Sequence, residues 1–206
     1  MAVLASDGGR AAVGARRGWR LGGRPKALPR HRGRPLVELA CDGLRAAGCA
    51  PVVVVVEAGA DEVLAGARLD GCRVVRTPAR ESGVGSSLRA GLAALAAPTP
   101  PTAALVALVD QPFVGAAAMA RVAAVCDSPD VLAAASYRGA RGHPVLLGAA
   151  HFAGVTAGAR GDRGARDYLR ARADRLTRVE CGDVGSPEDI DHPADLGRLS
   201  EPPPHR

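Results

Sequence analysis

The sequence predicts a single α/β domain built as a three-layer sandwich, with a mainly parallel sheet between two layers of helices. Apolar strands alternate with amphipathic helices from residue 36 onward, and two of these strands, PVVVVVE (51–57) and ALVALV (104–109), are continuously apolar. Such strands are typical of a sheet that helices cover on both faces. The chain has 206 residues, which is the usual size of one domain.

The elements follow one another in a regular order. Residues 36–47 place leucine and alanine side chains on one helical face, and Gly48 ends that helix. We expect right-handed crossovers between the parallel strands. After the strand at 51–57 we expect a helix at 61–69, a strand at 73–77, a helix at 87–96, a surface loop at 97–102, a strand at 104–109, a helix at 116–126, strands at 131–137 and 144–147, a helix at 165–173, a strand at 178–181, a helix at 193–199 and a flexible tail at 201–206.

Composition narrows the range of functions. The chain has 27 basic and 21 acidic residues and a net charge of +6, which favours nucleic acid, a membrane surface or a small polyanionic ligand. Aromatic residues make up only 2% of the chain, too few for stacking on bases. The apolar runs are far shorter than the ~20 residues that cross a bilayer, and residues 1–10 lack the apolar centre of a signal peptide. We therefore expect a cytoplasmic protein that binds phosphates, with no nucleic-acid or membrane partner.

The five cysteines are scattered along the chain. No pair shows the spacing of a metal site or a redox motif. Each lies beside apolar residues, so we expect reduced thiols in the core of a cytosolic protein. They are Cys41, Cys49, Cys72, Cys126 and Cys181.

Two glycine-containing segments have the composition of phosphate-binding loops. RLGGRPK (20–26) combines two glycines with three cations, one of which, Lys26, is the only lysine of the chain. An arginine-rich surface loop is the alternative interpretation. In SGVGSSL (82–88), backbone N–H groups and a serine hydroxyl could contact a nucleotide at a helix start. Plain helix capping by Ser86 or Ser87 is the alternative there.

Carboxylates follow the strands at two places. Asp110 comes directly after the strand at 104–109, where ligands bind in parallel sheets and where a carboxylate can hold a divalent cation together with substrate phosphates. A turn or cap aspartate is the alternative. In DIDHP (189–193) the two carboxylates point to opposite sides of an extended segment, so at most one of them faces Asp110. Asp191 could instead cap the last helix, as Asp162 could cap the helix at 165–173.

In order along the chain, these segments resemble the MobA-like nucleotidyltransferases, and within them the molybdenum cofactor cytidylyltransferases. The resemblance covers about residues 18–200, and we expect a single domain at residues 1–200. It implies a Rossmann-like fold similar to that of nucleotide-diphospho-sugar transferases. The matching segments are RLGGRPKAL (20–28), GRPLVE (33–38), GVGSSLRAGL (83–92), LVDQP (108–112), GHPVLL (142–147), GDRGAR (161–166) and DIDHP (189–193).

The resemblance implies that the protein transfers a nucleoside monophosphate to a phosphorylated acceptor and releases pyrophosphate, with Mg²⁺ as cofactor. The RPK triplet (24–26) and the absence of an aspartate before the lysine resemble the cytidylyl branch. This implies CTP and a molybdopterin acceptor, with a molybdoenzyme or its chaperone as a further partner. The motifs assign Arg20, Lys26 and Asp110 to catalysis, Gly22, Lys26, Gly85 and Ser86 to nucleotide binding, Asp110 and Asp191 to the metal, and His143 and Asp162 to the acceptor side.

The opening segment, residues 1–17, departs from the family pattern. The family opens with an apolar strand that runs into LAAGxGxRxG, whereas here Arg16 stands where a turn glycine belongs. Either residues 1–6 form the strand and a longer loop follows, or the first dozen residues are not family sequence. An arginine held at positive φ costs roughly 1 kcal/mol or more. We therefore expect weaker nucleotide binding than a standard loop would give.

Two other functions stay open. Some relatives of this sequence type are NAD(P)H-linked oxidoreductases that act on pigment-like heterocycles, the nicotine blue reductases. The segment GVGSSL (83–88) lacks the last glycine of the dinucleotide fingerprint G-x-G-x-x-G, so only the resemblance favours this reading. A non-catalytic nucleotide-binding module is the second alternative.

Overall fold

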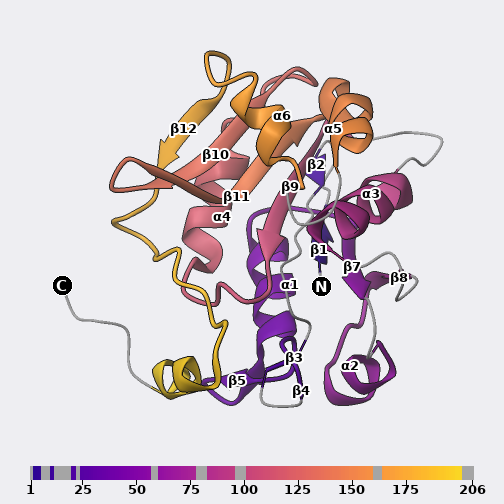
Figure 1. The fold of residues 1–206 in the computed structure, drawn as a ribbon, viewed down its shortest axis with the longest axis vertical. Coiled ribbons are helices and arrows are strands. Elements are labelled where there is room, and N and C mark those ends of the chain that lie inside the picture. The colour runs from indigo at the N-terminus through magenta and orange to yellow at the C-terminus, as the bar shows by residue number, and fades with distance from the viewer. Residues whose placement is uncertain are drawn as a thin grey trace.

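The computed structural model describes residues 2–5, 10–11, 20–21, 24–56, 60–77, 83–95, 101–159 and 164–200. An eight-stranded sheet forms the centre of the described part, with helices on either side of it (Figure 1). Two short two-stranded sheets precede the first long helix.

From residue 36 onward, the strands and helices expected from the sequence occur in the expected order. The large sheet contains β1 (Ala2–Ala5), β2 (Arg10–Ala11), β7 (Val52–Val56), β8 (Cys72–Arg76), β9 (Ala103–Leu108), β10 (Leu132–Tyr137), β11 (Ala140–Gly148) and β12 (Thr177–Glu180). The small sheets pair β3 (Arg20–Leu21) with β4 (Arg24–Pro25), and β5 (Arg30–His31) with β6 (Arg34–Pro35). The helices are α1 (Leu36–Ala46), α2 (Ala60–Gly66), α3 (Val84–Leu95), α4 (Gly115–Ala123), α5 (Phe152–Gly158) and α6 (Arg166–Arg170), with 3₁₀ turns η1 (Ala149–His151) and η3 (Pro193–Leu199).

The strand directions confirm an α/β fold with a sheet that contains parallel strands, although the described large sheet is mixed: three of its strand pairs are parallel and four are antiparallel. The strand order is β12-β10-β11-β9-β1-β7-β8, with β2 beside β9. Strands β7 and β8 are parallel, as are β10 and β12, and β1 and β11 each run antiparallel to both of their neighbours. Strands β7, β8, β9, β10 and β12 therefore all point the same way, so their carboxyl ends lie at one edge of the sheet.

The opening segment begins with a strand, which was one of the two alternatives that the sequence left open. It comprises residues 2–5 and lies between β7 and β9. It runs antiparallel to both, however, so Ala5 pairs with Val52 and Leu105 near the amino ends of those strands. A strand of four small or aliphatic residues carries no feature that specifies its direction. Arg16 lies outside the described residues.

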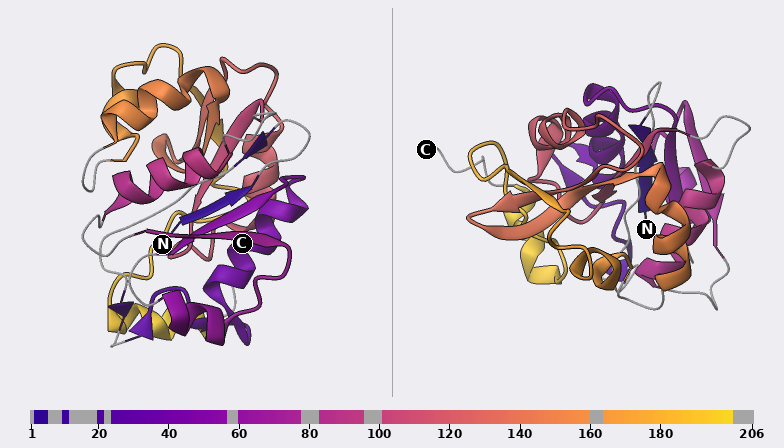
Figure 2. Two further views of the ribbon diagram at one scale, coloured as in Figure 1. Left: turned by 90° about the vertical axis from the view of Figure 1, so that its right-hand side faces the viewer. Right: turned by 90° about the horizontal axis from the view of Figure 1, so that it is seen from above.

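Two apolar cores lie on opposite faces of the sheet. Val52, Val54 and Val56 belong to the core beneath α1 and α4, whereas Val53 and Val55 belong to the core beneath α3, α5 and α6. Figure 2 shows the sheet between these two helical layers. Because both faces of β7 are buried, its sequence is an unbroken apolar run rather than an alternating one. The three-layer prediction is confirmed.

Four local expectations change. The helix at 87–96 begins three residues earlier, at Val84. Helix α5 was not expected, because FAGVTAG is short and has no clear apolar period. The strand at 144–147 extends over Ala140–Gly148, and the last helix is a 3₁₀ helix rather than an α-helix. Residues 97–100 of the predicted loop, residue 96 at the end of the predicted helix before it, and the tail at 201–206 lie outside the described residues.

All five cysteines are free thiols. Three are buried and two, Cys72 and Cys126, are half-buried, which confirms the expectation of reduced cysteines in or near the core. Within the described part of the chain, no helix has the length and apolarity needed to cross a membrane.

Candidate active site

A buried lysine joins two carboxylates at the carboxyl edge of the sheet. Asp110 follows β9 and is 4% exposed, and Lys26 is 9% exposed. The Lys26 Nζ atom lies 2.5 Å from Asp191 Oδ1 and 3.7 Å from Asp110 Oδ2. Lysine is rarely buried without a charged partner. The structure thus brings together three of the residues that the sequence motifs assigned to catalysis and metal binding.

Backbone hydrogen bonds fix Lys26 between β4 and α1. The N–H of Leu28 donates to Pro25 O at 3.0 Å, and the N–H of Val37, in the first turn of α1, donates to Ala27 O at 3.1 Å. Ala27 itself is buried in the core beneath α1. Because these bonds hold the residues on both sides of Lys26, the backbone position from which its side chain extends is fixed.

The segment that carries Asp191 is anchored to the end of β9. The N–H of Ile190 donates to Asp110 O at 2.8 Å, and the Ile190 side chain is fully buried. The N–H groups of Asp191 and His192 both donate to Asp195 Oδ2, at 3.0 and 2.8 Å. These two bonds, that from His192 first, lower the pKa of Asp195. His192, not Asp191, is the N-cap of η3, so the capping alternative for Asp191 is wrong.

Asp189 and Asp191 face different partners, as the extended spacing predicts. The Nε2 group of Gln111 donates to Asp189 Oδ1 at 2.7 Å and to Pro187 O at 3.0 Å. Gln111 therefore ties the 187–191 segment to the strand end beside Asp110. Its Oε1 atom is buried and has no hydrogen-bond partner among the described residues, which leaves an acceptor for water or substrate.

Sequence reasoning missed the parts played by Gln111 and Asp195. The position of Gln111 immediately after Asp110 was a signal that could have been used. Asp195 is the N3 residue of a capping box, a pattern that usually starts from serine or threonine rather than histidine.

Gly85 and Ser86 lie in the first turn of α3, not in the turn before it. Gly83, with φ of 118°, makes the turn that starts the helix. The Ser86 hydroxyl and its N–H both donate to Gly83 O, at 2.8 and 3.1 Å, so Ser86 does not cap the helix as an acceptor. Because α3 follows β8, its start lies at the same sheet edge as Asp110, which follows β9.

The remaining predicted residues are placed only in part. Arg20 lies in β3 and pairs with Pro25, so its backbone neighbours Lys26; its side chain is outside the described set, as are Gly22 and Asp162. His143 is half-buried in β11, two residues before Val145, which pairs with Val106 of β9. His143 therefore lies level with the end of β9, on the Asp110 side of the sheet.

The two carboxylates suit a divalent cation that also binds phosphates. Both carboxylates approach the Lys26 ammonium group. The distance between Asp110 Oδ2 and Asp191 Oδ1 therefore cannot exceed the sum of their distances to Lys26 Nζ. Magnesium favours oxygen ligands, and it is usually held by one or two carboxylates together with substrate phosphates and water. The donor set at this edge of the sheet fits that pattern.

Comparison with known proteins identifies the family. Residues 4–177 match the MobA-like NTP transferase domain. The chain is 37% identical over 189 residues to nicotine blue oxidoreductase of Paenarthrobacter nicotinovorans. The aligned residues make up 88% of this chain and 91% of that protein. The crystal structure of Rv0371c from Mycobacterium tuberculosis H37Rv superposes with a TM-score of 0.77 at 27% identity over 97% of this chain and 98% of that chain. A manganese complex of Rv0371c gives a TM-score of 0.71 at 27% identity over 86% and 92% of the two chains. The protein belongs to the family of MobA-like NTP transferase domains.

Proposed function

We propose that the protein is a magnesium-dependent nucleotidyltransferase that moves CMP from CTP onto a phosphorylated acceptor of the molybdopterin type and releases pyrophosphate. The observation that carries this proposal is the buried contact of Lys26 with both Asp110 and Asp191. The family supports a nucleoside triphosphate as substrate. The manganese complex of the related Rv0371c supports a divalent cation.

The reaction needs charge neutralisation more than a protein nucleophile. An oxygen of the acceptor phosphate attacks the α-phosphorus of CTP, the bond between that phosphorus and the oxygen bridging to the β-phosphate breaks, and pyrophosphate leaves. The reactants are both anions, and negative charge grows on the leaving group. Fixed cations aimed at that charge lower the barrier.

Lys26 is placed to supply one of these cations. Its ammonium group has three donors, so it can contact a phosphate oxygen and still keep its bond to Asp191. Arg20, in the strand paired with β4, is the proposed second cation. Asp110 and Asp191 would hold Mg²⁺, which when bound supplies positive charge shared between the phosphates. Ser86 and Gly85, at the start of α3, are the proposed nucleotide contacts.

The finer specificity rests on the sequence motifs. The RPK triplet that ends at Lys26 supports CTP. His143, level with the end of β9, and Asp162 are the proposed acceptor-side residues. A molybdoenzyme or its chaperone would then receive the product.

A second candidate is an NAD(P)H-linked oxidoreductase of the nicotine blue type. The observation that favours it is the 37% identity to nicotine blue oxidoreductase over most of both chains. Hydride transfer would not require paired carboxylates around a lysine, so the geometry favours the transferase.

One experiment separates the two candidates. The protein is incubated with Mg²⁺, molybdopterin and each nucleoside triphosphate in turn, and pyrophosphate release is measured. In parallel, NADH and NADPH oxidation is followed with a pigment-type heterocycle. Our proposal predicts pyrophosphate release that is fastest with CTP and no dependence on a nicotinamide nucleotide. Oxidation of NAD(P)H without pyrophosphate release from any triphosphate would contradict it and establish the second candidate.

A further inference from the structure

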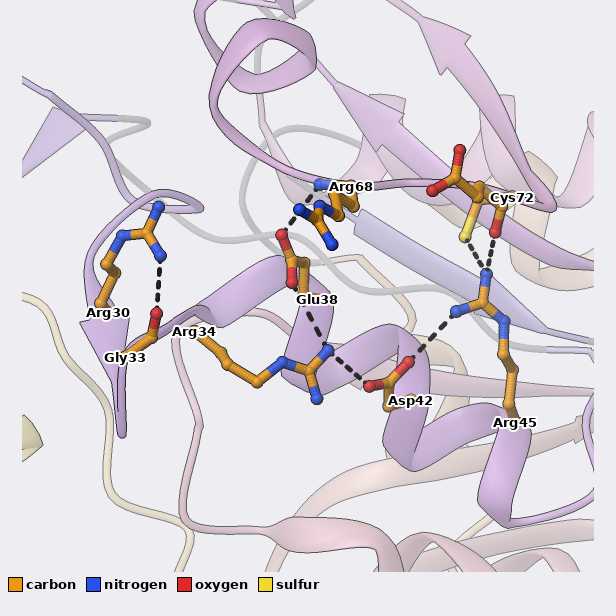
Figure 3. Close-up of polar contacts among 9 residues, drawn as sticks. Arg30, Gly33, Arg34, Glu38, Asp42, Arg45, Arg68 and Cys72 are labelled. Carbon is orange, nitrogen blue, oxygen red and sulfur yellow. Dashed lines mark hydrogen bonds and ion pairs between the residues drawn. The ribbon is translucent and has the colours of Figure 1, made fainter.

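The junction of α1 and β8 contains a second cluster of reactive groups, which the proposed reaction does not use. Cys72 is the first residue of β8 and is half-buried. Arg45, in the last turn of α1, reaches across to it: Nη2 lies 2.9 Å from Cys72 Sγ and also donates to Asp70 O at 2.5 Å (Figure 3). A guanidinium at this distance favours the thiolate form of a cysteine.

The guanidinium is held in place by its other contacts. Asp42, one turn earlier on α1, accepts from Arg45 Nη1 at 3.2 Å and pairs with Arg34 at 2.6 Å. The negative charge of Asp42 disfavours a thiolate at Cys72, but Asp42 is paired with two arginines, Arg34 and Arg45. The net effect of the charged groups around Cys72 is therefore positive.

A second cysteine lies against the first. Cys41 is 1% exposed and is four residues before Arg45, on the same face of α1. Cys72 packs against the apolar core that contains Cys41, and the two sulfur atoms lie within hydrogen-bonding reach of each other. This contact, followed by the charge of Arg45, lowers the pKa of Cys72 to about 7, although burial and Asp42 oppose the change. The same contact and burial raise the pKa of Cys41. Because the pKa is lowered at Cys72 and raised at Cys41, Cys72 is the first of the two thiols to ionise as the pH rises.

We propose that Cys72 is a peroxide-sensitive modification site and that Cys41 is its resolving thiol. The Cys72 thiolate attacks one oxygen of hydrogen peroxide, the O–O bond breaks, and the released hydroxide takes a proton to form water, which leaves a sulfenic acid at Cys72. The Cys41 thiol then attacks the Cys72 sulfur, an S–S bond forms, and the hydroxyl group leaves as water with the Cys41 proton. Overall, two thiols and one peroxide give one disulfide and two waters.

The expected reactivity follows from the thiolate fraction. A thiol with a pKa of about 7 is half ionised at pH 7, against about 1% for a pKa near 9, a gain of about fifty-fold. Nucleophilicity falls with pKa and removes roughly ten-fold of that gain. A rate advantage of roughly five-fold over an ordinary thiol is left. Because Cys41 lies against Cys72, the sulfenic acid at Cys72 is expected to react with the Cys41 thiol rather than with another cysteine.

The test uses the full-length protein with hydrogen peroxide at neutral pH. Samples are quenched over time with an alkylating reagent and mapped by peptide mass spectrometry. We expect a Cys41–Cys72 disulfide that dithiothreitol reverses, and oxidation of Cys72 several-fold faster than that of Cys126, the other half-buried cysteine. In Cys41→Ser, dimedone should trap a sulfenic acid at Cys72. Arg45→Met should slow Cys72 oxidation several-fold, whereas Cys126→Ser should leave it unchanged.

The mapping of the unmodified protein and the exposed Arg45→Met variant keep the test decisive even if the buried Cys41→Ser substitution prevents folding. A different disulfide pair, equal oxidation rates at Cys72 and Cys126, or an unchanged rate in Arg45→Met would each overturn the proposal. None of these outcomes depends on nucleotidyl transfer, so the proposal stands or falls separately from the proposed function.

Discussion

Replacing Lys26 with methionine keeps the unbranched apolar stem of the side chain and removes the charged end. In the native protein the ammonium contacts Asp110, which is 4% exposed, and Asp191, whose side chain is 32% exposed. Breaking a buried ion pair on one side costs about 3–5 kcal/mol, whereas an exposed pair contributes about 1 kcal/mol or less. Asp110 has a further partner and Asp191 is partly screened by water. We therefore expect Lys26→Met to lower the free energy of unfolding by about 2–3 kcal/mol.

The same substitution should affect catalysis more than stability. Removing one group that stabilises developing charge typically costs about 100-fold to 1,000-fold in kcat. Urea unfolding measures the first effect, and single-turnover pyrophosphate release from CTP, at a temperature where the variant is folded, measures the second.

A double variant separates the two effects. Lys26→Met combined with Asp110→Asn removes the carboxylate that lost its cation, so it should recover part of the stability and none of the activity. Native rates and native stability in Lys26→Met would refute this account of the site. Full recovery of activity in the double variant would show that the role of Lys26 is structural and not catalytic.

Three further predictions can be checked independently. Asp191→Asn should lower kcat/KM for pyrophosphate release at least about 100-fold. Asp189→Asn should keep most of the activity, because the oxygen of the new asparagine amide can still accept from Gln111 Nε2. A Cβ on Gly148 would lie 2.1 Å from Pro129 O, so Gly148→Ala should cost about 1–3 kcal/mol in thermal or urea unfolding, whereas Gly158→Ala, whose Cβ would meet open space, should not destabilise the fold. Alkylation of Cys72 should rise with pH with a midpoint near 7, because its neighbours in the folded state lower its pKa. This lowered pKa should add stability as the pH rises from about 7 toward the ordinary thiol value of about 9, and that stability should be lost as the pH falls through 7. A midpoint near 9 would show that the neighbouring groups have no effect.

The sequence predicts most of the scaffold because burial on two faces leaves a plain pattern. The runs at β7 and β9 are apolar throughout, and the end of β9 fixes where Asp110 must lie. The start of α3 was harder to predict, because serines favour turns and caps. Ser86 instead folds its hydroxyl back onto Gly83 O inside the helix.

The assembly of the site depends on contacts that periodicity cannot supply. Lys26 and Asp191 are separated by 165 positions in the chain, and only the resemblance to a family placed them together. The anchoring of this segment by Gln111 and Asp195 is likewise a property of the folded chain. The direction of β1 was not predictable either, since four small and aliphatic residues can pair in both directions.

The central claim, that Asp110 and Asp191 hold a divalent cation while Lys26 contacts the triphosphate, is tested most directly by anomalous X-ray scattering from Mn²⁺ in crystals grown with CTP. We predict a manganese peak bonded to an oxygen of each of the two aspartates and to CTP phosphates, with the Lys26 ammonium against the same triphosphate. A manganese–CTP complex bound away from these three side chains would contradict the account.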